Sequence, residues 1–470
     1  MNLVQRGIAK LFRLNTRRFE AASGRRWTAS GDVRFGSYGP ETLGATDAVR
    51  RRARAAVANN AWIANGVAAL VSNIIGAGIT PTSQHPGAVA RKLAQKAFAR
   101  WAVSCDADGL TDFYGLQAAA VRAMIIDGES FVQLIATEAG LRLRLIPAEL
   151  IDLGHTVELG GGARVVAGVE FDSAGVRTAY WVRPIDPTSV YESYGPPVRV
   201  PAADMLHLFR PLGPGQVRGI SWLAPILIRS GELDQLEDAL LVGAKVAAMH
   251  AGFLIDQNGT AASGTPYEGI GLGSILETGL EPGTLKVLPG GYDVRFSTPQ
   301  QAQQTVEFAK LELRGIAAGL GVPEFLLTGD LSGANYGSQR GGLVEFRKRN
   351  EAIQFHTVIP QLLRPIWDRF VLFAVLSGGL DGSDFSATVE EHQACEWIPP
   401  AQEWIDPAKD AQATATMIGS GLMSRRQAVA ARGYSVEDLD AEIAADRERE
   451  EGLGLAFTPT GEREAANAPA

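Results

Sequence analysis

One stretch decides how this chain is organised: Gly329-Asp330-Leu331-Ser332-Gly333-Ala334-Asn335-Tyr336-Gly337-Ser338-Gln339-Arg340-Gly341-Gly342. Its five glycines and several turn-forming side chains favour backbone states outside helices and strands, so we predict an irregular loop over residues 323–342. A loop of this length inside a compact domain is usually functional. The patterns on either side of it predict ordered helices that hold it in place.

Apolar side chains at three- and four-residue spacing predict a helix over residues 299–320, before the loop, and another over residues 343–378, after it. Prolines should kink or divide the second helix. Residues 221–249 form a third long helical pattern, and a glycine-rich stretch of short apolar pieces, residues 251–296, separates it from the first. We therefore expect two antiparallel helices that carry a small α/β module at their tip.

The rest of the chain predicts an α+β protein that is mainly helical. Helical patterns cover residues 46–75, 87–104 and 112–127, and the period changes to two from Glu129 onward. Turn-forming residues then divide alternating segments, which predicts antiparallel β-hairpins with one exposed face. Near the C-terminus, three helix starts are predicted from N-cap residues, namely Asp406, Ser424 and Ser435.

Composition excludes several protein classes. With 470 residues and 46% hydrophobic content, the chain can bury a large core. Cys105 and Cys395 are its only cysteines, which excludes a disulfide framework and fits a reducing compartment. Arg6 and Lys10 interrupt the first apolar residues, so we expect no secretion signal. The most apolar stretch, residues 66–79, is shorter than the roughly 20 residues that cross a bilayer, and we expect no membrane span.

Charge is distributed unevenly along the chain, whose net charge is −8. Residues 1–54 carry twelve Lys or Arg against four Asp or Glu, whereas residues 381–470 carry eighteen Asp or Glu against seven Lys or Arg. A basic arm of this kind can bind nucleic acid, but contact with a neighbouring subunit or simple solvation is the commoner explanation.

Catalytic motifs are missing. The sequence contains no phosphate-binding loop that ends in Lys and Ser/Thr, and no Gly-x-Ser-x-Gly elbow. Its six histidines are scattered, with no pair at i, i+4, and each is expected to be structural. We therefore expect no enzymatic activity, no cofactor and no metal.

The helix predicted over residues 221–249 carries an acidic cluster. It comprises Glu232, Asp234, Glu237 and Asp238. A nuclease could use such a cluster to hold a divalent metal. However, four acids within seven residues of a helix spread over a broad arc instead of converging on one point, which favours a solvated or channel-lining face.

The order of the parts resembles the lambda-type family of bacteriophage portal proteins. The resemblance rests on several runs, which are Val217-Arg218-Gly219-Ile220-Ser221-Trp222-Leu223-Ala224-Pro225, Gly279-Leu280-Glu281-Pro282-Gly283, Ile316-Ala317-Ala318-Gly319-Leu320-Gly321-Val322-Pro323, Asn335-Tyr336-Gly337-Ser338, Arg364-Pro365-Ile366-Trp367, Trp397-Ile398-Pro399-Pro400 and Asp406-Pro407-Ala408-Lys409-Asp410-Ala411. It extends from about Asp47 to Gly454.

This resemblance implies a portal fold with wing, stem, clip and crown regions, assembled as a ring that is typically a dodecamer. The implied regions are a basic N-terminal arm (1–45), the wing (46–220), a first stem helix (221–250), the clip (251–298), a second stem helix (299–322), a tunnel loop (323–342), wing helices and a strand (343–398), crown helices (399–452) and a disordered tail (453–470). In the tunnel loop, the residues expected to line a DNA channel are Ser332, Asn335, Tyr336, Ser338, Gln339 and Arg340.

The resemblance also implies a location and partners. The ring would sit at one vertex of the virion capsid after assembly in the host cytoplasm, and double-stranded DNA would pass through it. It would bind the terminase large subunit, a head-completion or adaptor protein, and the major capsid protein or scaffold. Two alternatives remain open: a metal-dependent nuclease or ATPase of the packaging machinery, and a peripheral membrane or scaffold protein that uses the basic arm.

Overall fold

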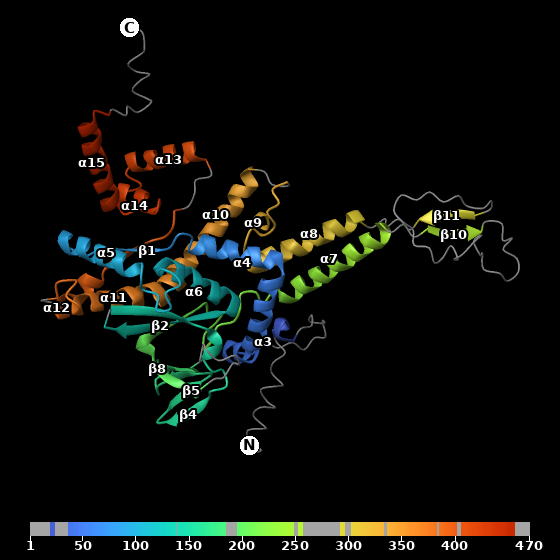
Figure 1. The fold of residues 1–470 in the computed structure, drawn as a ribbon, viewed down its shortest axis with the longest axis horizontal. Helices are drawn as coiled ribbons and strands as arrows, with labels where there is room; N and C mark the ends of the chain where they lie inside the picture. Colours follow the sequence, from blue (N-terminus) through green and yellow to red (C-terminus); the bar gives the residue numbers. More distant parts are fainter. Residues whose placement is uncertain are drawn as a thin grey trace, which may run out of the picture.

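The computed structural model consists of a mixed helical and β body from which a two-helix hairpin projects (Figure 1). This confirms the predicted α+β class. The structure describes residues 19–23, 36–138, 140–184, 195–248, 252–256, 292–296, 302–332, 336–382, 385–401 and 406–455. Most of the predicted clip, the tail after residue 455 and most of the basic arm lie outside the described residues.

The N-terminal half of the body is a helical lobe. Its helices are α2 (Glu20–Ser23), α3 (Tyr38–Asn59), α4 (Ala61–Ile74), α5 (Ala88–Ala102) and α6 (Phe113–Asp127). The prediction of one helix over residues 46–75 was wrong, because the chain is extended at Asn60 (φ −106°, ψ 116°). The Asn60 side chain accepts a hydrogen bond from the Ile63 N–H at 2.9 Å, so it caps a new helix. Moreover, α3 begins at Tyr38, inside the segment predicted as the basic N-terminal arm, residues 1–45.

Two antiparallel sheets pack below the lobe. One has the order β3-β2-β9, from β2 (Glu129–Thr137), β3 (Gly140–Ile146) and β9 (Met205–Phe209). The other is a meander of β4 (Val157–Gly160), β5 (Ala163–Val166), β6 (Val169–Phe171), β7 (Arg177–Val182) and β8 (Val198–Pro201). A third pairing joins distant segments, because β1 (Thr80–Ser83) pairs with β12 (Cys395–Ile398).

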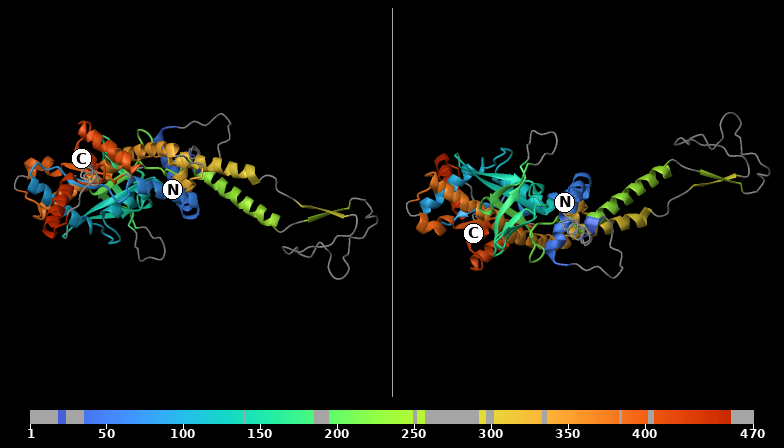
Figure 2. Two further views of the ribbon diagram at one scale, coloured as in Figure 1. Left: turned by 90° about the horizontal axis from the view of Figure 1, so that it is seen from above. Right: turned by 90° about the horizontal axis from the view of Figure 1, so that it is seen from below.

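The projecting hairpin consists of α7 (Leu227–Ala248) and α8 (Ala302–Leu320), which lie side by side (Figure 2). An ion pair of 3.1 Å between Arg229 Nε and Glu312 Oε2 links the two helices. The sequence placed the start of the first helix at Ser221. The helix starts later because Pro225 disfavours a helical backbone at the residue before it, and residues 222–226 form turns instead. Strands β10 (Gly252–Asp256) and β11 (Tyr292–Phe296) pair antiparallel between the two helices in sequence.

The loop in the glycine-rich stretch is shorter than the predicted loop of residues 323–342. Residues 324–328 form helix α9 (Glu324–Thr328), which ends at Gly329 with φ +71°. The next helix, α10 (Tyr336–Ile353), then begins inside the predicted loop. Glycine costs a helix about 1 kcal/mol relative to alanine, but buried Phe346 anchors this helix in the core. Between α9 and α10 the described irregular backbone is therefore limited to residues 329–332, and residues 333–335 lie outside the described residues.

The long helical pattern after the loop is divided at its prolines. A π-helix, η3 (Gln354–Leu363), contains Pro360, and α11 (Arg364–Leu376) has Pro365 in its first turn. The remaining helices are α12 (Phe385–Gln393), α13 (Pro407–Gly419), α14 (Arg425–Ala430) and α15 (Val436–Leu453). Asp406 and Ser424 cap α13 and α14 as predicted, by accepting hydrogen bonds from the N–H groups of Lys409 and Gln427.

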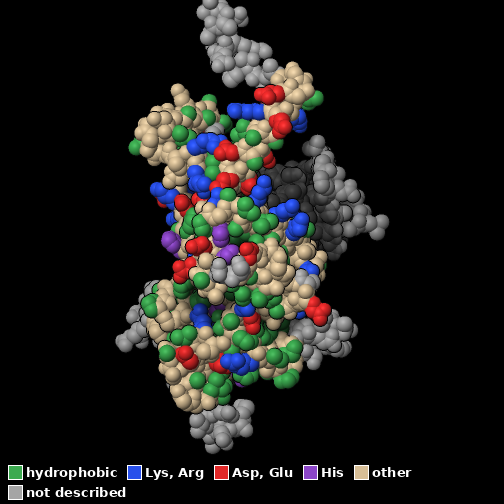
Figure 3. Space-filling view, turned by 90° about the vertical axis from the view of Figure 1, so that its left-hand side faces the viewer, with side chains coloured by type: hydrophobic (Ala, Val, Ile, Leu, Met, Phe, Trp, Pro, Cys, Tyr) green, Lys and Arg blue, Asp and Glu red, His purple; other side chains and the backbone are tan. Residues whose placement is uncertain are grey.

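One hydrophobic core joins the lobe, the sheet β3-β2-β9, the base of the hairpin and helices α10 and α11. Its largest fully buried side chains include Trp367, Phe98 and Phe113. The end of the body opposite the hairpin carries interspersed basic, acidic and hydrophobic side chains (Figure 3). Among the described helices, none is long and apolar enough to cross a membrane.

Candidate functional site

The residues expected to form the channel-lining loop lie around the start of α10. Ser332 is exposed, and its N–H donates a 2.9 Å hydrogen bond to Asp330 Oδ1, which fixes a turn after α9. Asn335 lies outside the described residues. Tyr336 and Ser338 belong to the first turn of α10, and Gln339 follows there half-buried. The structure therefore places the four residues from Tyr336 onward in the first turns of α10, and Ser332 in a turn after α9.

Arg340 is the one base in the predicted set, and it has a partner. Its Nη2 lies 3.4 Å from Asp410 Oδ1, so α10 is linked to α13. The Arg340 side chain is 45% exposed. Since exposed ion pairs contribute about 0–1 kcal/mol, a stronger anion could displace Asp410 at little cost.

The four acids of α7 are exposed, but some of them also contact other parts of the protein. Asp234 Oδ1 accepts a 2.6 Å hydrogen bond from Asn60 Nδ2, and Glu237 Oε1 accepts a 3.3 Å hydrogen bond from Trp62 Nε1. Two of the acids therefore hold the hairpin against the junction of α3 and α4. All four acids were expected to form a solvated or channel-lining arc, whereas Asp234 and Glu237 also bind the neighbouring helices.

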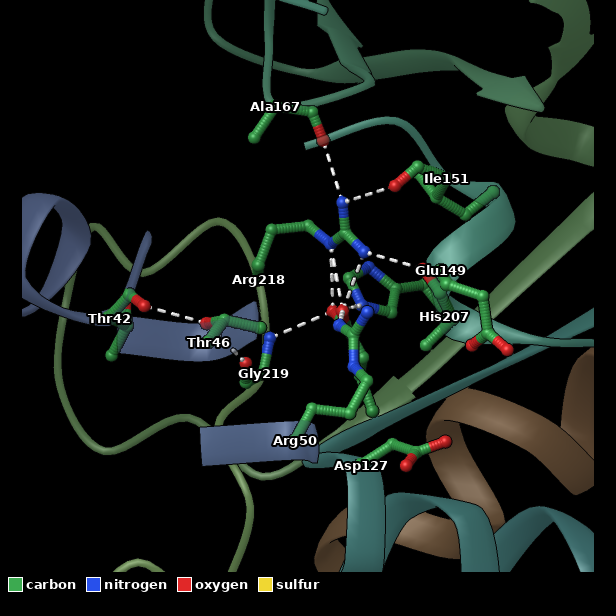
Figure 4. Close-up of polar contacts among 12 residues, drawn as sticks. Thr42, Thr46, Arg50, Asp127, Glu149, Ile151, Ala167, His207, Arg218 and Gly219 are labelled. Carbon is green, nitrogen blue, oxygen red and sulfur yellow. Dashed lines mark hydrogen bonds and ion pairs between the residues drawn. The ribbon is translucent and has the colours of Figure 1, made fainter. Parts of the chain in front are cut away.

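A buried ion network, made of Arg50, Glu129, His207 and Arg218, lies where the lobe, both larger sheets and the chain leading to α7 meet (Figure 4). Glu129 is fully buried at the start of β2. Arg218 Nη2 donates to Glu129 Oε1 at 2.6 Å, and Arg50 Nη2 donates to the same oxygen at 2.9 Å. Sequence reasoning missed this network, although Arg218 lies within a run that carried the family resemblance.

Arg218 also reaches the second sheet. Its Nη1 donates to the carbonyl oxygens of Ile151 and Ala167 at 3.1 and 2.7 Å, and its Nη2 donates to the Ala148 carbonyl at 3.1 Å. One fully buried guanidinium thus joins a carboxylate of β2 to three backbone carbonyls around the five-stranded sheet. The network therefore anchors the chain nine residues before α7 begins.

Two glycines make this approach possible. Gly128 ends α6 with φ +90°, and a Cβ there would lie 2.1 Å from the Ile220 carbonyl carbon. A Cβ at Gly219 would lie 2.0 Å from the Gly128 carbonyl oxygen. The close backbone contact brings the Gly219 N–H within 2.9 Å of Glu129 Oε2. Neither position can accept a larger residue without moving the network.

Burial, nearby charge and hydrogen bonds together determine the protonation states of Glu129 and His207. Burial alone would raise the pKa of Glu129, but the charge of Arg218 and hydrogen bonds from His207 and Arg218 outweigh burial and lower that pKa. Burial lowers the pKa of His207 to about 4, although Glu129 opposes this shift. Ionised Glu129 can only accept, so neutral His207 donates through Nε2 at 3.0 Å, and its buried Nδ1 has no described partner.

The network is structural in character. Every polar atom of Glu129 faces a protein donor and no solvent reaches it, so a substrate has no access to the carboxylate. In the part of the chain that the structure describes, no group of three or more His, Cys, Asp or Glu side chains could hold a metal.

The free half of the hairpin exposes apolar side chains on both helices. These side chains are 38–58% exposed and are Leu240, Leu241 and Val242 on α7 and Val306, Phe308 and Leu311 on α8. Exposed apolar clusters of this kind mark surfaces that bind other proteins.

Both the sequence and the fold of this chain are similar to those of known proteins. The model of the family described as "Phage portal protein, lambda family" matches residues 25–354. The chain is 26% identical to the "Probable portal protein" of Halomonas phage phiHAP-1 over 430 residues, which cover 87% of this chain and 82% of that one. It is 24% identical to "Portal protein B" of Escherichia phage lambda, over 70% of this chain and 67% of that one. Among solved structures, a chain from the neck of an empty gene transfer agent particle matches with a TM-score of 0.49 and 16% identity, covering 92% of this chain and 98% of that one.

Proposed function

Because this chain belongs to the lambda family of phage portal proteins, we propose that it forms a ring at one capsid vertex through which double-stranded DNA is packaged and ejected. The ring is a dodecamer, located in the virion and assembled in the host cytoplasm. The protein has no catalytic role of its own. One observation about this chain carries the proposal: the projecting hairpin leaves apolar side chains exposed on both of its helices.

Leu240, Leu241 and Val242 form an apolar flank on α7, and Val306, Phe308 and Leu311 form another on α8. A hairpin with two such flanks can bind two partners. If α7 of one copy packs against α8 of the next, each copy uses two different surfaces, and such head-to-tail contacts close into rings. Fully burying a large apolar side chain contributes about 1.5–3 kcal/mol. Six half-exposed side chains per contact would therefore contribute on the order of 5 kcal/mol before the cost of association.

The charges of the hairpin suit a channel for DNA. Helix α7 carries four acids and two bases, and α8 carries two of each. A surface with many Lys–phosphate contacts would bind DNA strongly and resist its movement. A mildly acidic stem leaves the duplex free to slide, and we assign close contact with DNA to the segment from Ser332 to Arg340, where Arg340 can exchange Asp410 for a phosphate.

The remaining regions supply docking surfaces. We assign residues 251–298 to the clip, which would meet the terminase large subunit during packaging and a head-completion or adaptor protein afterwards. Helices α13, α14 and α15 would form the crown, and the basic arm would contact capsid, scaffold, DNA or a neighbouring subunit.

Two flank variants test the head-to-tail geometry. Leu241→Glu damages the α7 flank, and Phe308→Glu damages the α8 flank, so each variant alone should remain monomeric. Mixed together, they retain one intact pair of flanks, and a heterodimer that cannot grow should form. Sedimentation velocity of each variant and of the mixture measures this outcome. Normal rings from either variant alone would contradict the proposed contact.

A further inference from the structure

A cleft of about 460 Å³ lies where the end of α8 meets α10, η3 and the turns before α7. Its wall includes the apolar side chains of Leu70, Leu320 and Ile353. Its polar lining consists of Arg210, Trp222, Arg349, Asn350, His356 and Thr357. Part of the wall is therefore π-helical, and π-helical turns often accompany functional sites.

Asn350 is the unusual residue of the cleft. It is 2% exposed, yet neither Nδ2 nor Oδ1 has a hydrogen-bond partner in the described part of the chain. Trp222 Nε1 is also buried there without a partner. An unsatisfied buried polar group costs about 1–3 kcal/mol, so two such residues at one cleft point to a ligand that satisfies them.

Two guanidinium groups make the cleft basic. Arg210 lies over the Trp222 ring, with its Cζ 5.5 Å from the ring centroid. Arg349 lies over Gly321, where a Cβ would be 3.1 Å from Arg349 Nη1. Neither arginine has a carboxylate partner among the described residues. The ligand should therefore be anionic, and it should accept hydrogen bonds from Asn350 Nδ2 and Trp222 Nε1.

We propose that this cleft receives an Asp or Glu side chain from a neighbouring copy of the chain. A carboxylate fits the two guanidiniums and the two unpaired donors, and a backbone N–H beside it can donate to Asn350 Oδ1. The cleft lies at the base of α8, the helix whose free half exposes Val306, Phe308 and Leu311. A copy packed along α8 would reach the cleft, and an excess of acids in the chain supplies carboxylates.

This inference rests on the proposed ring, and it names a polar contact that the apolar flanks do not provide. A DNA phosphate is a poorer occupant, because a duplex cannot bring its backbone to a side chain as deeply buried as Asn350.

Photo-cross-linking identifies the occupant. Ala352 lines the cleft and is exposed, so Ala352→p-benzoylphenylalanine places a probe at its mouth. The full chain is irradiated in the fraction that sediments as a ring, and the cross-linked peptides are sequenced by mass spectrometry. The expected product joins two copies through a peptide that contains an Asp or Glu. The same probe combined with Phe308→Glu should give no inter-copy product.

The inference would be overturned if rings form but the probe cross-links only within one chain, to another protein, to DNA or not at all. These outcomes would leave the proposed function intact. A chain that forms no ring fraction would remove the proposed function and this inference together.

Asn350→Leu gives an independent reading because its two expected effects have opposite signs. Removing an unpaired amide should raise the melting temperature of the monomeric chain by a few degrees. The same change should raise the concentration at which rings dissociate by about tenfold or more. Arg349→Glu should weaken rings likewise, whereas Arg100→Glu, with the same change in charge on exposed α5, should not. Unchanged ring dissociation in both cleft variants would contradict the inference.

Discussion

Glu129 and Arg218 hold the body together at the point where the hairpin leaves it. Removing one partner of a buried ion pair leaves an uncompensated charge in the core. The pair is fully buried, and Arg218 also satisfies three backbone carbonyls. The stability of the body and the anchoring of the chain that leads to the hairpin therefore depend on the same guanidinium.

Arg218→Met tests this dependence. We expect the free energy of unfolding to fall by about 3–5 kcal/mol, because Glu129 loses its main cation and the carbonyls lose their donor. The matched control is Arg144→Met, which breaks a 2.9 Å pair with Asp108 at a site where both side chains are exposed, by 44% and 46%; that loss should be about 1 kcal/mol or less. Urea unfolding of the monomeric chain measures both, and equal losses would show that burial of the pair is unimportant.

His207 predicts how stability depends on pH. Its pKa is lowered by burial to about 4 from 6.5, so between these values the unfolded chain binds a proton that the folded chain does not. The free energy of unfolding should therefore fall as pH decreases from 6.5 to 4. The lowered pKa of Glu129 acts in the same direction at lower pH, since stability is lost as that carboxylate is protonated.

His207→Gln keeps a donor for Glu129 but cannot titrate. In that variant the free energy of unfolding should change less between pH 6.5 and pH 4, because one proton fewer binds on unfolding. Urea unfolding across this pH range measures the difference. Identical slopes in the two proteins would contradict the assignment of a neutral buried histidine.

Helices and strands differ in how far the sequence alone could predict them. Caps at Asp406 and Ser424 and the hairpin of β2 and β3 follow from neighbouring residues, and the structure has them. The break at Asn60 has both a local and a distant component, because Asn60 caps α4 and its amide also donates a hydrogen bond to Asp234 of α7. The pairing of β1 with β12 joins residues some 300 positions apart, which no local pattern reports.

The candidate sites show the same division. Helical periodicity was enough to find the acids of α7, since all four lie within two turns. The buried ion network could not be found in this way, because each of its members is a lone residue in a different element. Composition also misled at the glycine-rich stretch, where packing of Phe346 overrides the weak helical propensity of the preceding glycines.

Glycines at the start of α10 lead to a prediction about that helix. A Cβ at Gly341 would meet no atom within 4 Å, and one at Gly342 only the Phe325 ring at 3.8 Å. Gly341→Ala should therefore stabilise the helix by about 0.5–1 kcal/mol. If this segment must yield as DNA passes, the same change should slow packaging although it raises stability. Thermal unfolding and a packaging assay measure the two effects, and a stabilised variant that packages normally would contradict a need for a pliable segment.

At the scale of the whole molecule, the hairpin, the cleft at its base and the buried ion network lie next to one another along the chain that leads into α7. Arg218 anchors the chain before the hairpin, and in the arrangement that we propose the flanks of α7 and α8 supply apolar contacts and the cleft supplies a polar contact. All three are explained by one arrangement in which identical copies surround a common axis. The basic N-terminal and acidic C-terminal segments would then repeat around the ring, at positions that contact neighbours or solvent.

The mass and shape of the assembled particle test this arrangement most directly. Twelve copies of the 50.0 kDa chain would weigh about 600 kDa. Native mass spectrometry of the purified full-length protein, with electron microscopy of the same fraction, should give that mass and rings with a central hole wide enough for a DNA duplex. A particle of two-fold symmetry, or a ring whose hairpins do not touch their neighbours, would contradict the account.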